Sequence, residues 1–209
     1  MVIPSQCKMP DLSGLDSPLI GRLIVQLLGG ERGLSRKTSL YRKIFVRLVD
    51  KALREYHEAR AAILTQIAEA NRPAKEMKKH GRYIFMFEFT DHIENCINAA
   101  SRLYKLLDRI KSEKESLALP RELRRLVETK IESVKDVRDA VEHMDERIQK
   151  DEIAPGKPIM LSVSKNADGV IVSNHEIKFQ ELAMVIEKMH EIALFILTVK
   201  KVEFEEHGF

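Results

Sequence analysis

The chain has 209 residues, of which 44% are hydrophobic and 32% charged, and this length and composition indicate one globular domain over residues 1–209 rather than a disordered chain. Its 35 basic and 32 acidic residues give a net charge of +3, which is too small to predict nucleic-acid binding through overall charge. Cys7 and Cys96 form no disulfide or zinc pattern, and we find neither a secretory signal nor a stretch able to span a bilayer. We therefore expect a cytoplasmic protein without membrane association.

The first part of the chain is expected to be an irregular arm followed by two helices. Three prolines and a glycine predict the arm over residues 1–18, and a short helix is expected at 19–28. Ser35 suits the N-cap of a long charged helix, which Pro73 must end or kink.

Two further helices follow from apolar residues spaced three and four apart. This spacing runs from Phe85 to Ile110 in the third helix, and Pro120 suits the first turn of the fourth. The stripe of the fourth helix that we expect to face the core comprises Ile131, Val134, Val137, Val141, Met144 and Ile148.

The period changes near residue 158. Two β-rich runs flank the turn sequence Asn166–Gly169, which predicts a β-hairpin over residues 158–174. Helical spacing returns at 178–204 and predicts a C-terminal helix. The expected fold is therefore all-α, an antiparallel helical bundle with a small β-hairpin inserted before the C-terminal helix.

The segment "VRDAVEHMDERI" at 137–148 sets an arginine and a histidine among many acids. On a helical wheel, Arg138 and His143 lie on opposite flanks of the polar face, about 140° apart. One helix cannot easily bring both onto one small ligand, whereas two copies packed across a twofold axis can. This geometry favours a homodimer with a shared site, if a site exists.

Arg138, four intervening residues and His143 match the R-x(4-6)-H signature of the HEPN superfamily, so the chain resembles that family over this motif and over the helical layout of residues 36–150. The resemblance implies a dimeric helical bundle. Many members are metal-independent endoribonucleases of toxin or defence type, with the motif of two protomers forming the site, and others are non-catalytic binding or regulatory modules. The chain departs from the family at Asp139, where members often have asparagine.

The candidate catalytic group consists of Arg138, His143, Asp139 and Glu142. His143 could exchange protons with the ribose 2′-hydroxyl and the leaving oxygen, and Arg138 could hold the developing phosphoryl charge. Asp139 would hydrogen-bond His143 at the i,i+4 spacing. This chemistry requires no metal ion and no cofactor, and none is expected.

Charge argues against a nuclease in this region. Residues 132–152 carry eight acids against four bases, and an acidic face repels phosphate. RNA would have to be held elsewhere, by a candidate nucleic-acid-binding group that comprises Arg121, Arg124, Arg125 and Lys130, or by the basic turn at 72–82. The alternative is a non-catalytic helical dimer with a protein partner, such as an antitoxin-like protein, in which Arg138 pairs with Glu142 and His143 with Asp139.

Two further patterns have an ordinary structural interpretation as well as a functional one. Glu187 and His190 match one Glu-x-x-His step of di-iron bundles, but such a site needs two steps, so surface pairing is the expected role. The cluster "RYIFMFEF" at 82–89 would suit base stacking, yet its helical spacing favours core packing.

Overall fold

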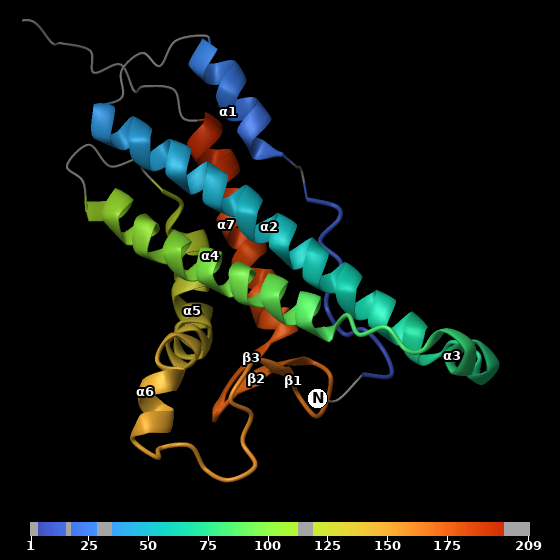
Figure 1. The fold of residues 1–209 in the computed structure, drawn as a ribbon. Coiled ribbons are helices and arrows are strands. Elements are labelled where there is room, and N and C mark those ends of the chain that lie inside the picture. The colour runs from blue at the N-terminus through green and yellow to red at the C-terminus, as the bar shows by residue number, and fades with distance from the viewer. Residues whose placement is uncertain (1–3, 16–17, 29–34, 113–118, 199–209) are drawn as a thin grey trace, which may run out of the picture.

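The computed structural model describes residues 4–15, 18–28, 35–112 and 119–198, and this part of the chain is mostly helical, with seven helices and a three-stranded antiparallel sheet before the last helix (Figure 1). The helices are α1 (Leu19–Leu28), α2 (Arg36–Ala70), α3 (Ala74–His80), α4 (Met86–Ser112), α5 (Arg121–Glu142), α6 (Met144–Gln149) and α7 (Phe179–Thr198). The strands are β1 (Ser162–Val163), β2 (Gly169–Val172) and β3 (His175–Lys178). None of the helices in the described ranges has both the length and the apolar character needed to cross a membrane.

Helices α2 and α4 lie side by side and run in opposite directions (Figure 1). Helix α2 begins as expected, because the Ser35 hydroxyl accepts a hydrogen bond from the backbone N–H of Thr38 at 3.2 Å. It ends at Ala70, before Pro73. The core between the helices is aromatic and aliphatic, and its fully buried side chains include Phe45, Val49, Tyr56, Phe89, Ile93 and Leu103.

The arm that precedes α1 contains neither helix nor strand in residues 4–15. It is nevertheless attached to the core, because Met9 and Leu12 are buried and the Tyr56 hydroxyl donates a 3.0 Å hydrogen bond to the carbonyl of Pro10. The arm therefore covers one side of α2.

Helix α5 packs on α4 and α7 through Val127, Ile131, Val134, Val137 and Ala140. The expectation of one continuous helix to residue 148 is wrong. The backbone of His143 leaves the helical region with φ −107° and ψ 21°, and α6 starts afresh at Met144. The buried stripe consequently ends at Ala140, Val141 and Met144 are half-buried, and Ile148 is 54% exposed.

The sheet is larger than the expected hairpin at 158–174. Strands β1 and β2 pair around the predicted turn, with Ser162 opposite Ile171, but β3 adds a third strand in which Ile177 lies opposite Val170. Helix α7 begins at Phe179 directly after β3, and its first N–H donates to the carbonyl of Asp168 at 2.8 Å. Of the predicted helix at 178–204, residues 199–204 lie outside the described residues.

The connection between α2 and α4 also differs from expectation. A short helix, α3, fills residues 74–80, where the sequence suggested only a basic turn. Gly81 then adopts a positive φ of 73°, which favours glycine, and the chain returns to Met86 through a segment that is neither helix nor strand.

Candidate functional site

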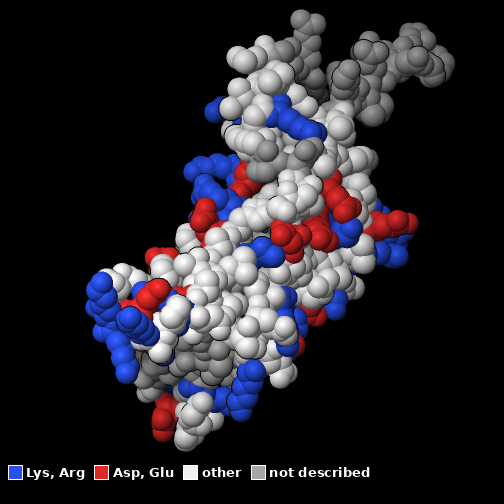
Figure 2. Space-filling view, turned by 90° about the vertical axis from the view of Figure 1, so that its right-hand side faces the viewer, with Lys and Arg blue, Asp and Glu red and all other residues white. Residues whose placement is uncertain are grey.

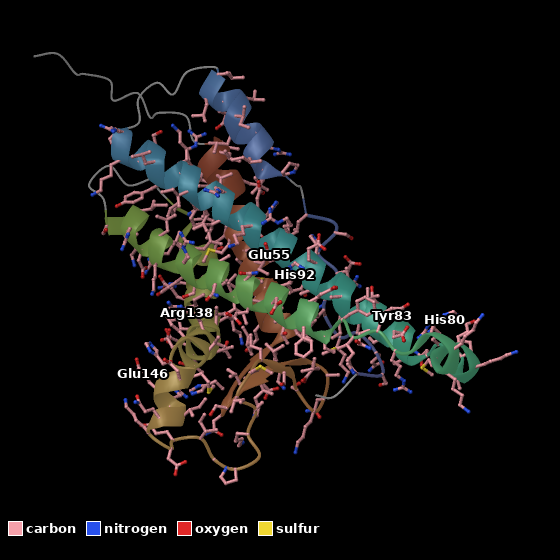
Figure 3. The ribbon with its side chains drawn as sticks, viewed as in Figure 1. Glu55, His80, Tyr83, His92, Arg138 and Glu146 are labelled. Carbon is pink, nitrogen blue, oxygen red and sulfur yellow. The ribbon has the colours of Figure 1, made fainter. Side chains whose placement is uncertain are left out.

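Arg138 lies on the last turns of α5 with its side chain 24% exposed (Figure 3). Its guanidinium forms ion pairs with two carboxylates, Asp139 at 2.9 Å and Glu142 one turn further along the helix. Both carboxylates are about half-exposed, so solvent screens these pairs. Two of the four predicted catalytic residues therefore hold a third, and Arg138 is oriented before any ligand arrives.

His143 is the residue at which α5 ends. Its backbone N–H donates to the carbonyl of Asp139, and its side chain is 53% exposed. The carboxylate beside its Nδ1 is that of Glu146, at 3.4 Å, instead of Asp139 as expected. The Asp139 carboxylate pairs with Arg138 instead, and α6, which begins at Met144, places Glu146 one turn after His143. With a carboxylate next to Nδ1, Nε2 is the ring atom left for proton exchange.

Sequence reasoning missed a second histidine near this end of α5. His175 lies on β3, which packs against α5, and its Nε2 accepts a 3.2 Å hydrogen bond from the guanidinium of Arg147 on α6. The pair went unnoticed because its members are 28 positions apart and because β3 was not predicted.

Of the predicted nucleic-acid-binding residues, Arg121, Arg124 and Arg125 lie in the first two turns of α5 and Lys130 lies near its middle. Arg121 begins the helix and Glu142 ends it, which separates the two ends by about 30 Å at 1.5 Å per residue. Lys130, the member closest to His143 along the helix, donates a 3.0 Å hydrogen bond to Glu181 of α7. Within one protomer, this group therefore does not adjoin Arg138 and His143.

A second polar pair bridges α2 and α4. His92 Nδ1 lies 2.8 Å from Glu55 Oε2, and Arg54 donates to the other oxygen of Glu55 at 2.9 Å (Figure 3). Burial of the Glu55 carboxyl acts to raise its pKa, but the hydrogen bonds from His92 and Arg54 outweigh burial and leave the pKa below its ordinary value. The pair therefore joins the two longest helices through a charged carboxylate.

The Glu-x-x-His step of α7 takes part in no metal cluster here. His190 is buried, and among the described residues no group of three or more His, Cys, Asp or Glu side chains is placed to hold a metal ion. The aromatic cluster at 82–89 divides between two roles. Met86 and Phe89 enter the core as expected, whereas Tyr83, Ile84 and Phe87 are exposed.

No family model matches the chain, and comparisons with curated proteins and with solved structures found no match.

Proposed function

We propose that the chain is a HEPN-like, metal-independent endoribonuclease that acts as a homodimer, with Arg138 and His143 in its active site. The observation that carries this proposal is the end of α5 at His143. There an imidazole is half-exposed, has a carboxylate beside its Nδ1, and lies within two turns of an arginine held by Asp139 and Glu142. The opposite directions of α2 and α4 agree with the antiparallel helical bundle that the proposal implies.

The chemistry needs only proton transfer and charge stabilisation. His143 Nε2 takes the proton of a ribose 2′-hydroxyl, whose oxygen attacks the adjacent phosphorus while the bond to the 5′-oxygen breaks. That leaving oxygen receives a proton from a protonated imidazole, and the product is a 2′,3′-cyclic phosphate. Arg138 stabilises the extra negative charge on the phosphoryl oxygens in the transition state.

A dimer completes this site. Arg138 points along the flank of α5 toward its own carboxylates, whereas His143 lies beyond the last turn, next to Glu146. A twofold axis near the end of α5 would place the arginine of one protomer beside the histidine of the other, because such an interface repeats the same patch in reverse.

The second candidate is a non-catalytic helical dimer that binds another protein. It is favoured by the two ion pairs of Arg138, since a guanidinium shared between two carboxylates has little charge left for phosphate. In this alternative, Arg138 and His143 stabilise the solvated end of α5, and RNA is not a substrate.

Heterodimers distinguish the composite site from other arrangements. Arg138→Ala and His143→Ala homodimers should not cleave a mixed RNA substrate in the presence of EDTA, whereas Lys150→Ala, which removes an exposed charge from the same region, should cleave like wild type. A heterodimer of the two inactive variants, purified through two different tags, has one of its two composite sites intact, with Arg138 from one protomer and His143 from the other. It should recover about half of the wild-type rate and release cyclic-phosphate ends.

If the wild-type homodimer cleaves RNA but the heterodimer of the two variants does not, Arg138 and His143 of one site must come from the same protomer. Folded, dimeric wild-type protein that cleaves no RNA above the level of a variant carrying both Arg138→Ala and His143→Ala would refute the nuclease and favour the protein-binding dimer.

A further inference from the structure

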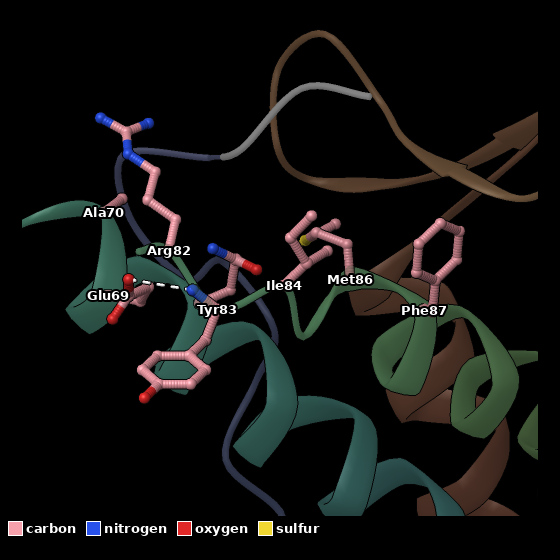
Figure 4. A pocket seen from close by; sticks show the side chains of 8 residues that line it. Glu69, Ala70, Arg82, Tyr83, Ile84, Met86 and Phe87 are labelled. Atoms are coloured by element: carbon pink, nitrogen blue, oxygen red, sulfur yellow. Dashed lines mark hydrogen bonds between the residues drawn. The ribbon is translucent and has the colours of Figure 1, made fainter. Parts of the chain in front are cut away.

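The connection between α2 and α4, residues 71–85, projects from the end of the two long helices and is referred to below as the tip (Figure 1). Its returning segment is fixed to α2 by side chains near the end of that helix (Figure 4). The buried Gln66 accepts a 2.7 Å hydrogen bond from the N–H of Phe85, and Glu69 accepts one of 3.2 Å from the N–H of Tyr83. The segment that carries Tyr83 therefore has a defined position.

A pocket of about 320 Å³ opens beside this segment (Figure 4). It is lined by Gln66, Glu69, Ala70, Arg82, Tyr83, Ile84, Met86 and Phe87. Three apolar side chains around it are more than half exposed, Tyr83 at 56%, Ile84 at 66% and Phe87 at 55%. More than half of each side chain therefore remains open to solvent, although the Tyr83 ring also contacts Arg72 and Phe85.

The tip also holds unbalanced positive charge. Lys75, Lys78, Lys79 and Arg82 are exposed, and none of them forms an ion pair with any residue that the structure describes. Arg72, by contrast, pairs with Glu69 at 2.7 Å and lies over the Tyr83 ring, 5.4 Å from its centroid. Figure 2 looks at the side of the molecule from which α3 projects, where Lys and Arg side chains lie in groups together with some Asp and Glu.

From these contacts we propose that the tip binds single-stranded nucleic acid, with bases stacked on Tyr83 and Phe87 and the phosphates near the lysines of α3. Aromatic faces beside a basic surface are the combination that single strands require, because each base has a π-face and each nucleotide has a phosphate. The pocket volume lies near the lower limit of ligand pockets, roughly 300 Å³, which suits one base better than the several anchors of an amphipathic helix.

The carboxylate in the pocket wall argues for a base and against an acidic peptide. Glu69 already accepts hydrogen bonds from Arg72 and from the backbone N–H of Tyr83, and a carboxylate has further lone pairs for an exocyclic amino group. An acidic side chain entering the same pocket would meet a like charge. This inference goes beyond the cleavage proposal and holds whether or not Arg138 and His143 are catalytic.

Fluorescence anisotropy with labelled 20-nucleotide oligouridylate and oligothymidylate tests the tip, using full-length His143→Ala protein so that no probe is cleaved. Tyr83→Ala and Phe87→Ala should each weaken binding by about 5- to 150-fold, the range for loss of one stacked base. Tyr83→Phe should bind within about twofold of its parent, because the ring is kept. Ile148→Ala, which shortens an exposed apolar side chain elsewhere, is the matched control and should bind normally.

The predicted contacts between the lysines and the phosphates are tested by the salt dependence of the binding affinity. If Lys78 and Lys79 each neutralise one phosphate, changing both to Gln should reduce the slope of log K against log salt by about 1.4, at 0.7 per contact. Lys105→Gln, an exposed lysine on α4, should leave the slope unchanged. Comparing the uridylate and thymidylate probes shows whether the ligand is RNA, DNA or both.

Two results would overturn the proposal. One is wild-type affinity in both aromatic alanine variants after circular dichroism has shown that they are folded. The other is the absence of binding to both oligonucleotides at low salt. Binding of a polyglutamate peptide at the tip in the absence of oligonucleotide binding would show that the ligand is an acidic peptide. Both results concern binding alone, so they leave the cleavage proposal to its own test.

Discussion

Gly169→Ala is expected to destabilise the sheet that supports β3 and His175. Gly169 lies opposite Lys178 in the β2–β3 ladder. A Cβ at this position would lie 3.1 Å from both the carbonyl carbon of Ile177 and the Cα of Lys178, and closer still to the Ile177 oxygen. These are backbone atoms, which cannot rotate away as a side chain would. The strands would have to separate locally.

The size of the effect follows from this geometry. Forcing one methyl group into closely packed backbone costs about 1 to 3 kcal/mol, which for a chain of this length lowers Tm by about 2 to 12 °C. The strands cannot slip to avoid the methyl group, because the N–H of Phe179 is bonded to Asp168 and the N–H of Ser164 to Gly169 itself. Thermal unfolding followed by circular dichroism measures the change.

Gly21→Ala is the matched control. Gly21 lies inside α1, and an added Cβ there meets no atom within 4 Å. Alanine favours a helix over glycine by about 0.5 to 1 kcal/mol, so this variant should unfold at the same temperature as wild type or slightly higher. A Gly169→Ala protein with unchanged or raised Tm would refute this reasoning, because it would mean that a methyl group fits between β2 and β3 at this position.

Three further outcomes are expected. In urea unfolding, Val137→Ala should lower the free energy of unfolding by about 2 to 3 kcal/mol because Val137 is fully buried. Val141→Ala should lower it by less than about 1 kcal/mol because that side chain is half-buried. Equal losses of stability would contradict the position at which α5 ends. The bonds from His92 and Arg54 lower the pKa of Glu55, so the carboxylate's stabilisation is complete above its ordinary pKa and is lost as pH falls through the lower folded value. Urea midpoints between about pH 3 and 6 should therefore fall less steeply toward acid in Glu55→Gln than in wild type, and parallel curves would argue against the pair. Burial raises the pKa of the Cys96 thiol well above its usual range, so iodoacetamide should modify Cys96 only after unfolding, as read by mass spectrometry; labelling of the native protein would contradict its burial.

The long helices could be predicted from the sequence because the patterns that mark them, caps and apolar spacing, are local and strong. Ser35 caps α2, Pro73 follows its end, and the apolar spacing after Phe85 marks α4. Strand β3 was missed because its four residues have no clear alternation and helix-forming residues follow at once. The break at His143 has no glycine or proline to announce it, so tertiary packing decides where α5 stops.

Only those contacts of the candidate site that lie within one helix could be predicted from the sequence. Arg138 and Glu142 pair at the helical spacing that the sequence suggests. His143 lies beside Glu146 of α6 because Asp139 pairs with Arg138, and the contact of Arg147 with His175 depends on a strand. Side-chain partners beyond a helix end are set by the three-dimensional path of the chain, which periodicity does not describe.

The direct passage from β3 into α7 bears on which changes of length the chain can accept. Lys178 is the last residue of the strand and Phe179 the first of the helix, so no connecting residue can absorb an insertion. One added residue here would rotate α7 by about 100° about its axis relative to the sheet and turn its buried face away from α5. The stretch at 150–161 has no such constraint, because it contains neither helix nor strand and most of it is exposed. Natural length variants and inserted tags should therefore accumulate before β1 and be absent at the strand–helix junction.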